Sequence, residues 1–90
     1  MIQVTLRLRS FLRYVLGKPE LTLTLEDGST VIEAVNKFAN ENGDKIKEHI
    51  FDRKTGKCNA LFVVNKCQVP MEYILKDKDE LTNLPPLAGG

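Results

Sequence analysis

The chain has 90 residues, of which 42% are hydrophobic and 28% charged, and this composition predicts a single globular domain. Thirteen Lys and Arg residues nearly balance twelve Asp and Glu residues, which argues against a nucleic acid as the main partner because such proteins carry a strongly basic surface. No segment approaches the roughly 20 apolar residues of a membrane span, and residues 1–4 lack the charged start of a signal peptide. Two cysteines are too few for a disulfide framework. The expected location is therefore the reducing cytoplasm.

Two strands are predicted near the N-terminus. Residues 2–8 alternate between apolar and polar side chains, which is the pattern of a half-buried strand. Residues 10–17 are too short and too crowded with apolar side chains for a firm assignment, and we expect a connecting turn that can include a helical turn and ends at Gly17. Residues 21–26 alternate again and predict a second strand, which Asp27, Gly28 and Ser29 break.

The clearest predicted element is a helix that begins after Thr30. Thr30 and Glu33 have the spacing of a capping box, in which each side chain satisfies a backbone amide of the other residue. One apolar stripe follows at helical spacing: Val31, Ala34, Val35, Phe38 and Ala39. Gly43 is suited to the left-handed cap position, and residues 46–51 can form a further turn or helix.

The second half of the chain predicts three more strands. The expected elements are a surface turn at residues 52–57, a central strand at 60–64, a short edge strand at 67–69 ended by Pro70, a charged loop at 75–80, and a last strand at 80–84. A helix with one apolar face that follows a first hairpin packs most economically on a mixed sheet. We therefore predict an α+β fold of the β-grasp kind, with four to five strands on one main helix and the first and last strands side by side at the centre.

Residues 1–84 are expected to form this domain, and residues 85–90 to form an extended C-terminal segment. The segment reads Pro-Pro-Leu-Ala-Gly-Gly, and prolines favour an extended path away from a strand. Glycine lacks a Cβ atom, so Gly89 and Gly90 can enter a narrow channel. At about 3.3 Å per residue, the segment could carry its last carboxylate roughly 20 Å from the domain. A frayed terminus is the alternative interpretation.

Three stretches of the sequence resemble the ubiquitin-like sulfur carriers, and among them the small subunit of molybdopterin synthase. These stretches are residues 4–17, residues 62–66, and residues 75–90, which end in Leu-Pro-Pro-Leu-Ala-Gly-Gly. The related thiamine-pathway carriers also end in Gly-Gly but usually lack the two prolines. The sequence departs from the family at Lys66, where glycine is usual, and at Arg7, where many relatives carry an exposed aromatic residue.

The resemblance implies a two-stage chemistry at Gly90. An E1-like activating enzyme would use Mg-ATP to adenylate the Gly90 carboxylate, and sulfur from a persulfide donor would displace AMP to leave a thiocarboxylate. In the molybdenum-cofactor route, the large subunit of molybdopterin synthase would then take up the segment: Pro85, Pro86, Leu87, Ala88 and Gly89. The carrier itself needs no catalytic side chain, bound cofactor or metal, and is not an enzyme by itself.

The resemblance also implies an apolar docking surface on the exposed sheet face, for which Leu84, Leu61, Val63, Leu87 and Arg7 are the candidates. Strand alternation places Leu84 opposite Leu81 and out of the core, where it can serve a partner or simply close the edge of the core. The same alternation places Asn83 inward. It is then either hydrogen-bonded or the predicted register is wrong by one residue, because a buried amide without a partner costs roughly 1–3 kcal/mol.

Other chemically notable residues favour structural interpretations. His49 is expected to be solvated, Cys58 and Cys67 to be ordinary thiols, and the acidic residues Asp77, Asp79 and Glu80 to form a solvated turn rather than a cation loop. A basic strip is compatible either with an acidic partner surface or with plain solvation: Arg7, Arg9, Arg13 and Lys18.

Two other function classes compete with the sulfur carrier of molybdopterin synthesis. One is a ubiquitin-like modifier joined through Gly90 to lysines of other proteins, and a related option is a sulfur carrier for thiamine synthesis or tRNA thiolation. The other is an interaction module of β-grasp fold whose C-terminal segment has no role.

Overall fold

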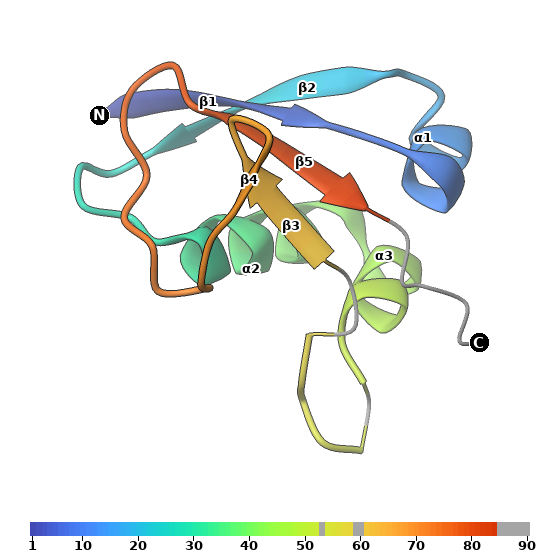
Figure 1. The fold of residues 1–90 in the computed structure, drawn as a ribbon. Coiled ribbons are helices and arrows are strands. Elements are labelled where there is room, and N and C mark those ends of the chain that lie inside the picture. Colours follow the sequence, from blue (N-terminus) through green and yellow to red (C-terminus); the bar gives the residue numbers. More distant parts are fainter. Residues whose placement is uncertain (53, 59–60, 85–90) are drawn as a thin grey trace.

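The computed structural model describes residues 1–52, 54–58 and 61–84 and arranges them as one sheet with three helices (Figure 1). The elements in chain order are β1 (Ile2–Arg7), α1 (Ser10–Leu16), β2 (Glu20–Leu25), α2 (Val31–Asn42), α3 (Asp44–Ile50), β3 (Leu61–Val64), β4 (Cys67–Gln68) and β5 (Glu80–Leu84). The predicted strands and main helix are confirmed. Ala60, expected to begin β3, lies outside the described residues, and so does the C-terminal segment (residues 85–90).

The sheet is mixed and has the strand order β2-β1-β5-β3-β4. β1 and β5 run parallel, with Leu6 opposite Leu81, and the other neighbouring strands are antiparallel. The first and last strands therefore lie side by side, as predicted, and β5 is the middle strand. No helix in the described part of the chain is long and apolar enough to cross a membrane.

The core lies between one face of the sheet and α2 (Figure 1). All five residues of the predicted helical stripe are buried, and Phe38 is completely so, at 0% exposure. The capping box is present: Thr30 Oγ1 accepts from the Glu33 amide at 3.3 Å, and Glu33 Oε1 accepts from the Thr30 amide at 2.9 Å. Because the box fixes where α2 begins, it also fixes which residues face the sheet.

Two helix boundaries differ from the predictions. Residues 10–16 form the complete helix α1, which ends at Gly17 in the left-handed conformation, with φ 70° and ψ 19°. Gly43 has a positive φ of 93° but an extended ψ of 172°, so the predicted left-handed cap is wrong. α3 begins at the next residue, and the sharp change of direction between two consecutive helices requires this backbone conformation, which is readily open only to glycine.

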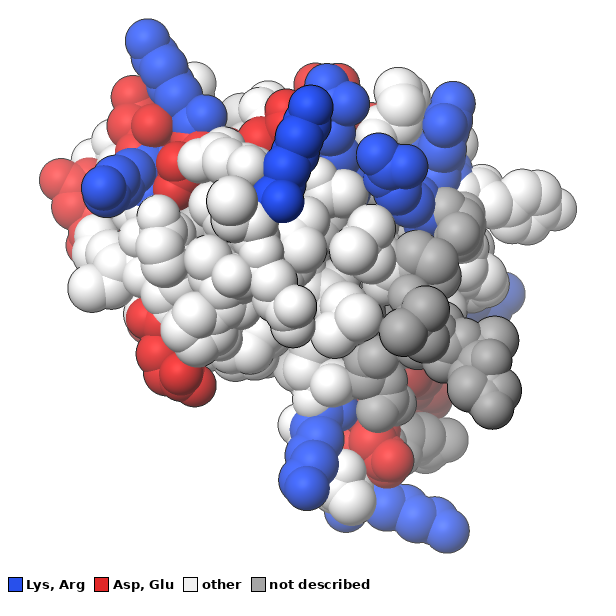
Figure 2. Space-filling view, in the orientation of Figure 1, with Lys and Arg blue, Asp and Glu red and all other residues white. Residues whose placement is uncertain are grey.

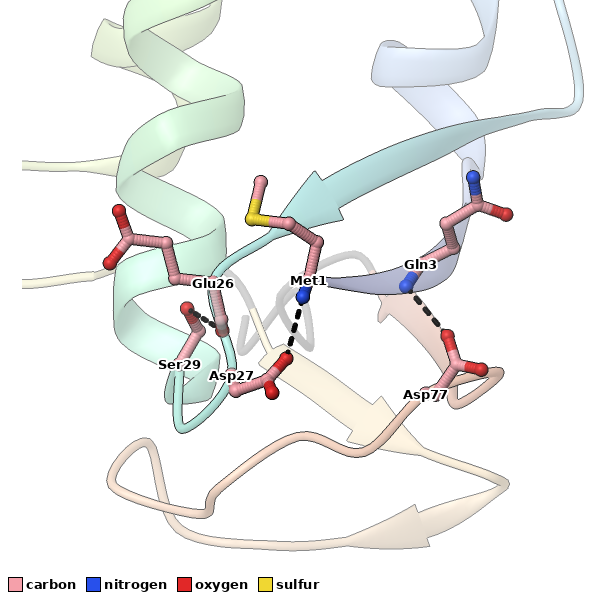
Figure 3. A network of polar contacts seen from close by, with 6 residues as sticks. All are labelled: Met1, Gln3, Glu26, Asp27, Ser29 and Asp77. Carbon is pink, nitrogen blue, oxygen red and sulfur yellow. Dashed lines mark hydrogen bonds and ion pairs between the residues drawn. The ribbon is translucent and has the colours of Figure 1, made fainter.

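The loop before β5 is more ordered than a solvated turn. The Asp77 carboxylate accepts a hydrogen bond from the Gln3 amide at 2.8 Å (Figure 3). Nearby, the Met1 ammonium group forms an ion pair with Asp27, and the Ser29 hydroxyl donates a hydrogen bond to the Glu26 carbonyl. Asp79 is only 7% exposed and accepts from the Lys76 amide at 2.8 Å. The solvated interpretation is therefore wrong for Asp79. Its carboxylate satisfies donors that the turn onto β5 would otherwise leave without acceptors.

Candidate functional site

The four described residues predicted to contact a partner all lie on the outer face of the sheet. In the strand register, Arg7 lies opposite Thr82, which lies opposite Val63. Leu84 lies opposite Leu61, and Leu61 is 43% exposed. We call Leu61, Val63, Thr82 and Leu84 the outer-face patch; Thr82 is only 5% exposed, so the three apolar residues supply its accessible surface. Figure 2 shows mostly uncharged side chains over β3 and β5, with Lys and Arg side chains at several places around them.

An ion pair joins two strands on this face. Arg7 Nε lies 3.2 Å from Glu80 Oε2, and both side chains are substantially exposed. Exposed pairs of this kind contribute less than about 1 kcal/mol to stability. The pair therefore serves mainly to hold the guanidinium of Arg7 beside the outer-face patch.

Asn83 fixes the end of β5 from the inner side. Its side chain is 2% exposed, and Oδ1 accepts a hydrogen bond from the Arg9 amide at 2.8 Å. Of the two alternatives for Asn83, the hydrogen-bonded one is confirmed and the predicted register is correct. The bond joins the residue before Leu84 to the residue before α1, so Leu84 is held in place on the outer face.

Solved structures with the same arrangement match nearly the whole length of the chain. Small archaeal modifier protein 1 of Haloferax volcanii has a TM-score of 0.85 at 17% identity, covering 97% of this chain and 100% of that one. Small archaeal modifier protein 1 of Methanosarcina acetivorans has a TM-score of 0.80 at 29% identity, covering 100% and 98%. The putative molybdopterin converting factor subunit 1 of Pyrococcus furiosus has a TM-score of 0.79 at 23% identity, covering 97% and 100%.

The fold is the ubiquitin-like β-grasp. The family resemblance of the sequence is thereby confirmed at the level of the fold. No protein-family model and no curated protein sequence matches the chain.

The remaining candidate residues of this ubiquitin-like domain lie apart from the outer-face patch. His49 on α3 is half-buried rather than solvated, and its ring centroid lies 4.3 Å from that of Phe11 on α1. Cys58 is half-buried and Cys67 exposed, and neither forms a disulfide. Within the described residues, no cluster of three or more His, Cys, Asp or Glu side chains could hold a metal ion.

Two residues of the outer face were missed in the sequence. Thr82 could have been found from the alternation along residues 80–84, which gives it the same face as Leu84. Glu80 is a different case, because its contact with Arg7 depends on the parallel pairing of β1 with β5. No local pattern in the sequence indicates that pairing.

Removing the buried amide of Asn83 should destabilise the ubiquitin-like domain. We expect Asn83→Ala to lower the free energy of unfolding by about 1–3 kcal/mol, because the part-buried hydrogen bond from the Arg9 amide is lost. Urea unfolding followed by circular dichroism measures the change. Asn40→Ala, at an exposed position on α2, is the control and should change stability by less than about 0.5 kcal/mol. Equal effects of the two substitutions would contradict the structural role of Asn83.

Proposed function

We propose that this protein is a ubiquitin-like carrier whose Gly90 carboxyl group is activated by an E1-like enzyme and converted to a thiocarboxylate. The observation that carries the proposal is the position of Leu84. It ends the middle strand of the sheet and lies on the outer face opposite the exposed Leu61. Residues 85–90 therefore follow directly from the outer-face patch, and a protein that takes up this segment also meets that patch.

The chemistry would proceed in balanced steps on the partner enzymes. A carboxylate oxygen of Gly90 attacks the α-phosphorus of Mg-ATP and releases pyrophosphate, giving an acyl adenylate. A persulfide sulfur attacks the acyl carbon and releases AMP, and a thiol then cleaves the acyl disulfide to give the thiocarboxylate and a new disulfide. Each step takes place in a partner's active site, which excludes water. The carrier contributes an acyl group without a side chain at its last two residues, so it acts as a substrate of other enzymes.

We further propose that the thiocarboxylate donates its sulfur to a pterin precursor bound by the large subunit of molybdopterin synthase. The Leu-Pro-Pro-Leu-Ala-Gly-Gly sequence and the similarity to the putative converting factor of Pyrococcus furiosus support this choice. Conjugation through Gly90 to lysines of other proteins is the second candidate. It is favoured by the 29% identity with the small archaeal modifier protein of Methanosarcina acetivorans over nearly the full length of both chains.

Intact-mass spectrometry tests the proposal directly. The chain is incubated with a purified E1-like enzyme, Mg-ATP and a persulfide donor, and its mass should rise by the difference between a sulfur and an oxygen atom. As a positive control, the same enzyme should convert the carrier protein of its own organism to a thiocarboxylate. If it does so while the mass of this chain stays unchanged, the proposal is overturned. Slow-migrating conjugates in cell extracts that disappear when Gly90 is deleted would favour the modifier function over the molybdopterin route.

A charge on the outer-face patch should weaken docking. We expect Leu61→Asp to raise the KM of the activating enzyme for the carrier by about tenfold or more, because the carboxylate would be placed in an apolar contact. Thr22→Asp, at an exposed position of β2 on the same sheet face, is the matched control and should leave KM nearly unchanged. Equal KM values for the two variants would exclude Leu61 from the contact.

A further inference from the structure

Three arginine residues gather around a shallow recess where β1 ends. The recess has a volume of about 160 Å³ and is lined by Arg7, Arg9 and Arg13 together with Leu8, Pro19 and Glu20. The hydrogen bond from the Leu8 amide to the Pro19 carbonyl, at 2.8 Å, joins its two sides. The end of β1, α1 and the start of β2 thus bring together part of the basic strip seen in the sequence. We call the three arginines and their surroundings the arginine recess.

The arginine recess carries an excess of positive charge that the rest of the molecule does not share. Three arginines and one acidic residue, Glu20, line the recess, although the net charge of the whole chain is only +1. Arg7 is paired with Glu80, whereas the exposed Arg9 and Arg13 form no ion pair with any carboxylate of the described residues. Guanidinium groups bind carboxylates through two parallel hydrogen bonds, so two such groups remain available to an outside ligand.

The recess lies beside the point where the chain leaves the sheet. The Arg9 amide is bonded to Asn83 Oδ1 at 2.8 Å, and Asn83 precedes Leu84, the last described residue. Arg7 continues from the recess onto the outer face, where it lies opposite Thr82 of the outer-face patch. A protein that takes up residues 85–90 would therefore meet the recess and the patch together.

We propose that the arginine recess docks carboxylate side chains on the surface of the enzyme that activates Gly90, and this inference rests on the proposed function. Both the carrier and the modifier candidates require this activation step, so the recess would serve either one. Charges at the rim of an interface mainly accelerate association and set its dependence on salt. The contact should therefore appear in KM and in its dependence on ionic strength, and leave kcat unchanged.

The test compares two double variants that change the net charge equally. Arg9→Glu with Arg13→Glu removes the recess, while Lys66→Glu with Lys76→Glu changes two exposed lysines at the other end of β5. Formation of the thiocarboxylate is followed by intact mass over a range of carrier concentrations and at ionic strengths from about 50 to 300 mM. For the arginine variant, KM should be about tenfold higher than for the wild type and should depend much less on ionic strength, with kcat within about twofold of the wild type. The lysine variant should change KM by less than about twofold.

A conservative variant and a competing anion complete the test. Arg9→Lys with Arg13→Lys keeps both charges, so its KM should stay close to that of the wild type. Unchanged melting temperatures would show that all variants are folded. Inorganic phosphate added at constant ionic strength should leave the wild-type KM unchanged. If phosphate raises the KM of the wild type but not that of the Arg9→Glu, Arg13→Glu variant, the recess binds a phosphate ligand and the proposal is overturned.

The failure of this inference is distinguishable from the failure of the proposed function. Equal KM values for the arginine and lysine variants would overturn the inference alone, because activation would still occur. A wild-type chain that is never activated would overturn the proposed function, and the inference with it.

Discussion

A chain that carries one additional alanine after Gly90 is expected to form no detectable thiocarboxylate. The proposed function places the reacting carboxyl group on Gly90, and the added residue would move it about 3.3 Å further along the channel of the activating enzyme. It would also bring a Cβ atom next to the attacked carbon, where glycine leaves space. Misplacement of a reacting group by about 1 Å can already cost about a hundredfold in rate.

The matched control for this extension is one alanine added before Met1. The Met1 ammonium group is paired with Asp27 in an exposed ion pair, so its displacement should cost less than about 1 kcal/mol and leave sulfur loading intact. Intact mass and thermal unfolding are measured for both extended chains, and both should melt close to the wild-type temperature. Thiocarboxylate formation on the chain extended after Gly90 would refute the proposed role of the Gly90 carboxyl group.

Replacing the most deeply buried aromatic residue should produce the largest loss of stability. Phe38 is 0% exposed and belongs to the stripe of α2 that packs against the sheet. We expect Phe38→Ala to lower the free energy of unfolding by about 3–5 kcal/mol, through lost burial and the cavity that remains. This is a large part of the roughly 5–15 kcal/mol that stabilises a small domain, and urea unfolding measures it.

Tyr14→Ala is the control for the removal of an aromatic side chain from a helix. Tyr14 lies on α1 and is 86% exposed, so its loss should change the free energy of unfolding by less than about 0.5 kcal/mol. Similar losses at the two positions would mean that α2 does not pack on the sheet as described. At a temperature where the Phe38 variant remains folded, its sulfur loading should match the wild type, because Phe38 is completely buried.

Local pattern in the sequence was sufficient for most of the fold. The capping box of Thr30 and Glu33 and the stripe behind it determine where α2 begins and which of its residues are buried. Strict alternation along residues 2–8 likewise determines which side chains of β1 face the core, because successive side chains of a strand point to opposite faces. In β5 the same two-residue period, counted from Leu81, places Asn83 inward and Leu84 outward. The placement of Leu84 on the outer face followed from the same rule. Leu61 and Val63 were candidates only through the family resemblance, because residues 60–64 are apolar throughout and show no alternation.

The contacts that shape the candidate site depend on pairings between distant parts of the chain. Arg7 meets Glu80 and Arg9 meets Asn83 only because β5 lies parallel to β1, across 73 and 74 positions of sequence. Alternation assigns a face to a residue but does not identify its neighbour on the next strand. Composition and periodicity therefore determined the elements and their buried faces. Only the tertiary structure decided that Asp79 is buried, that Asn83 has a partner, and that three arginines meet beside the end of the middle strand.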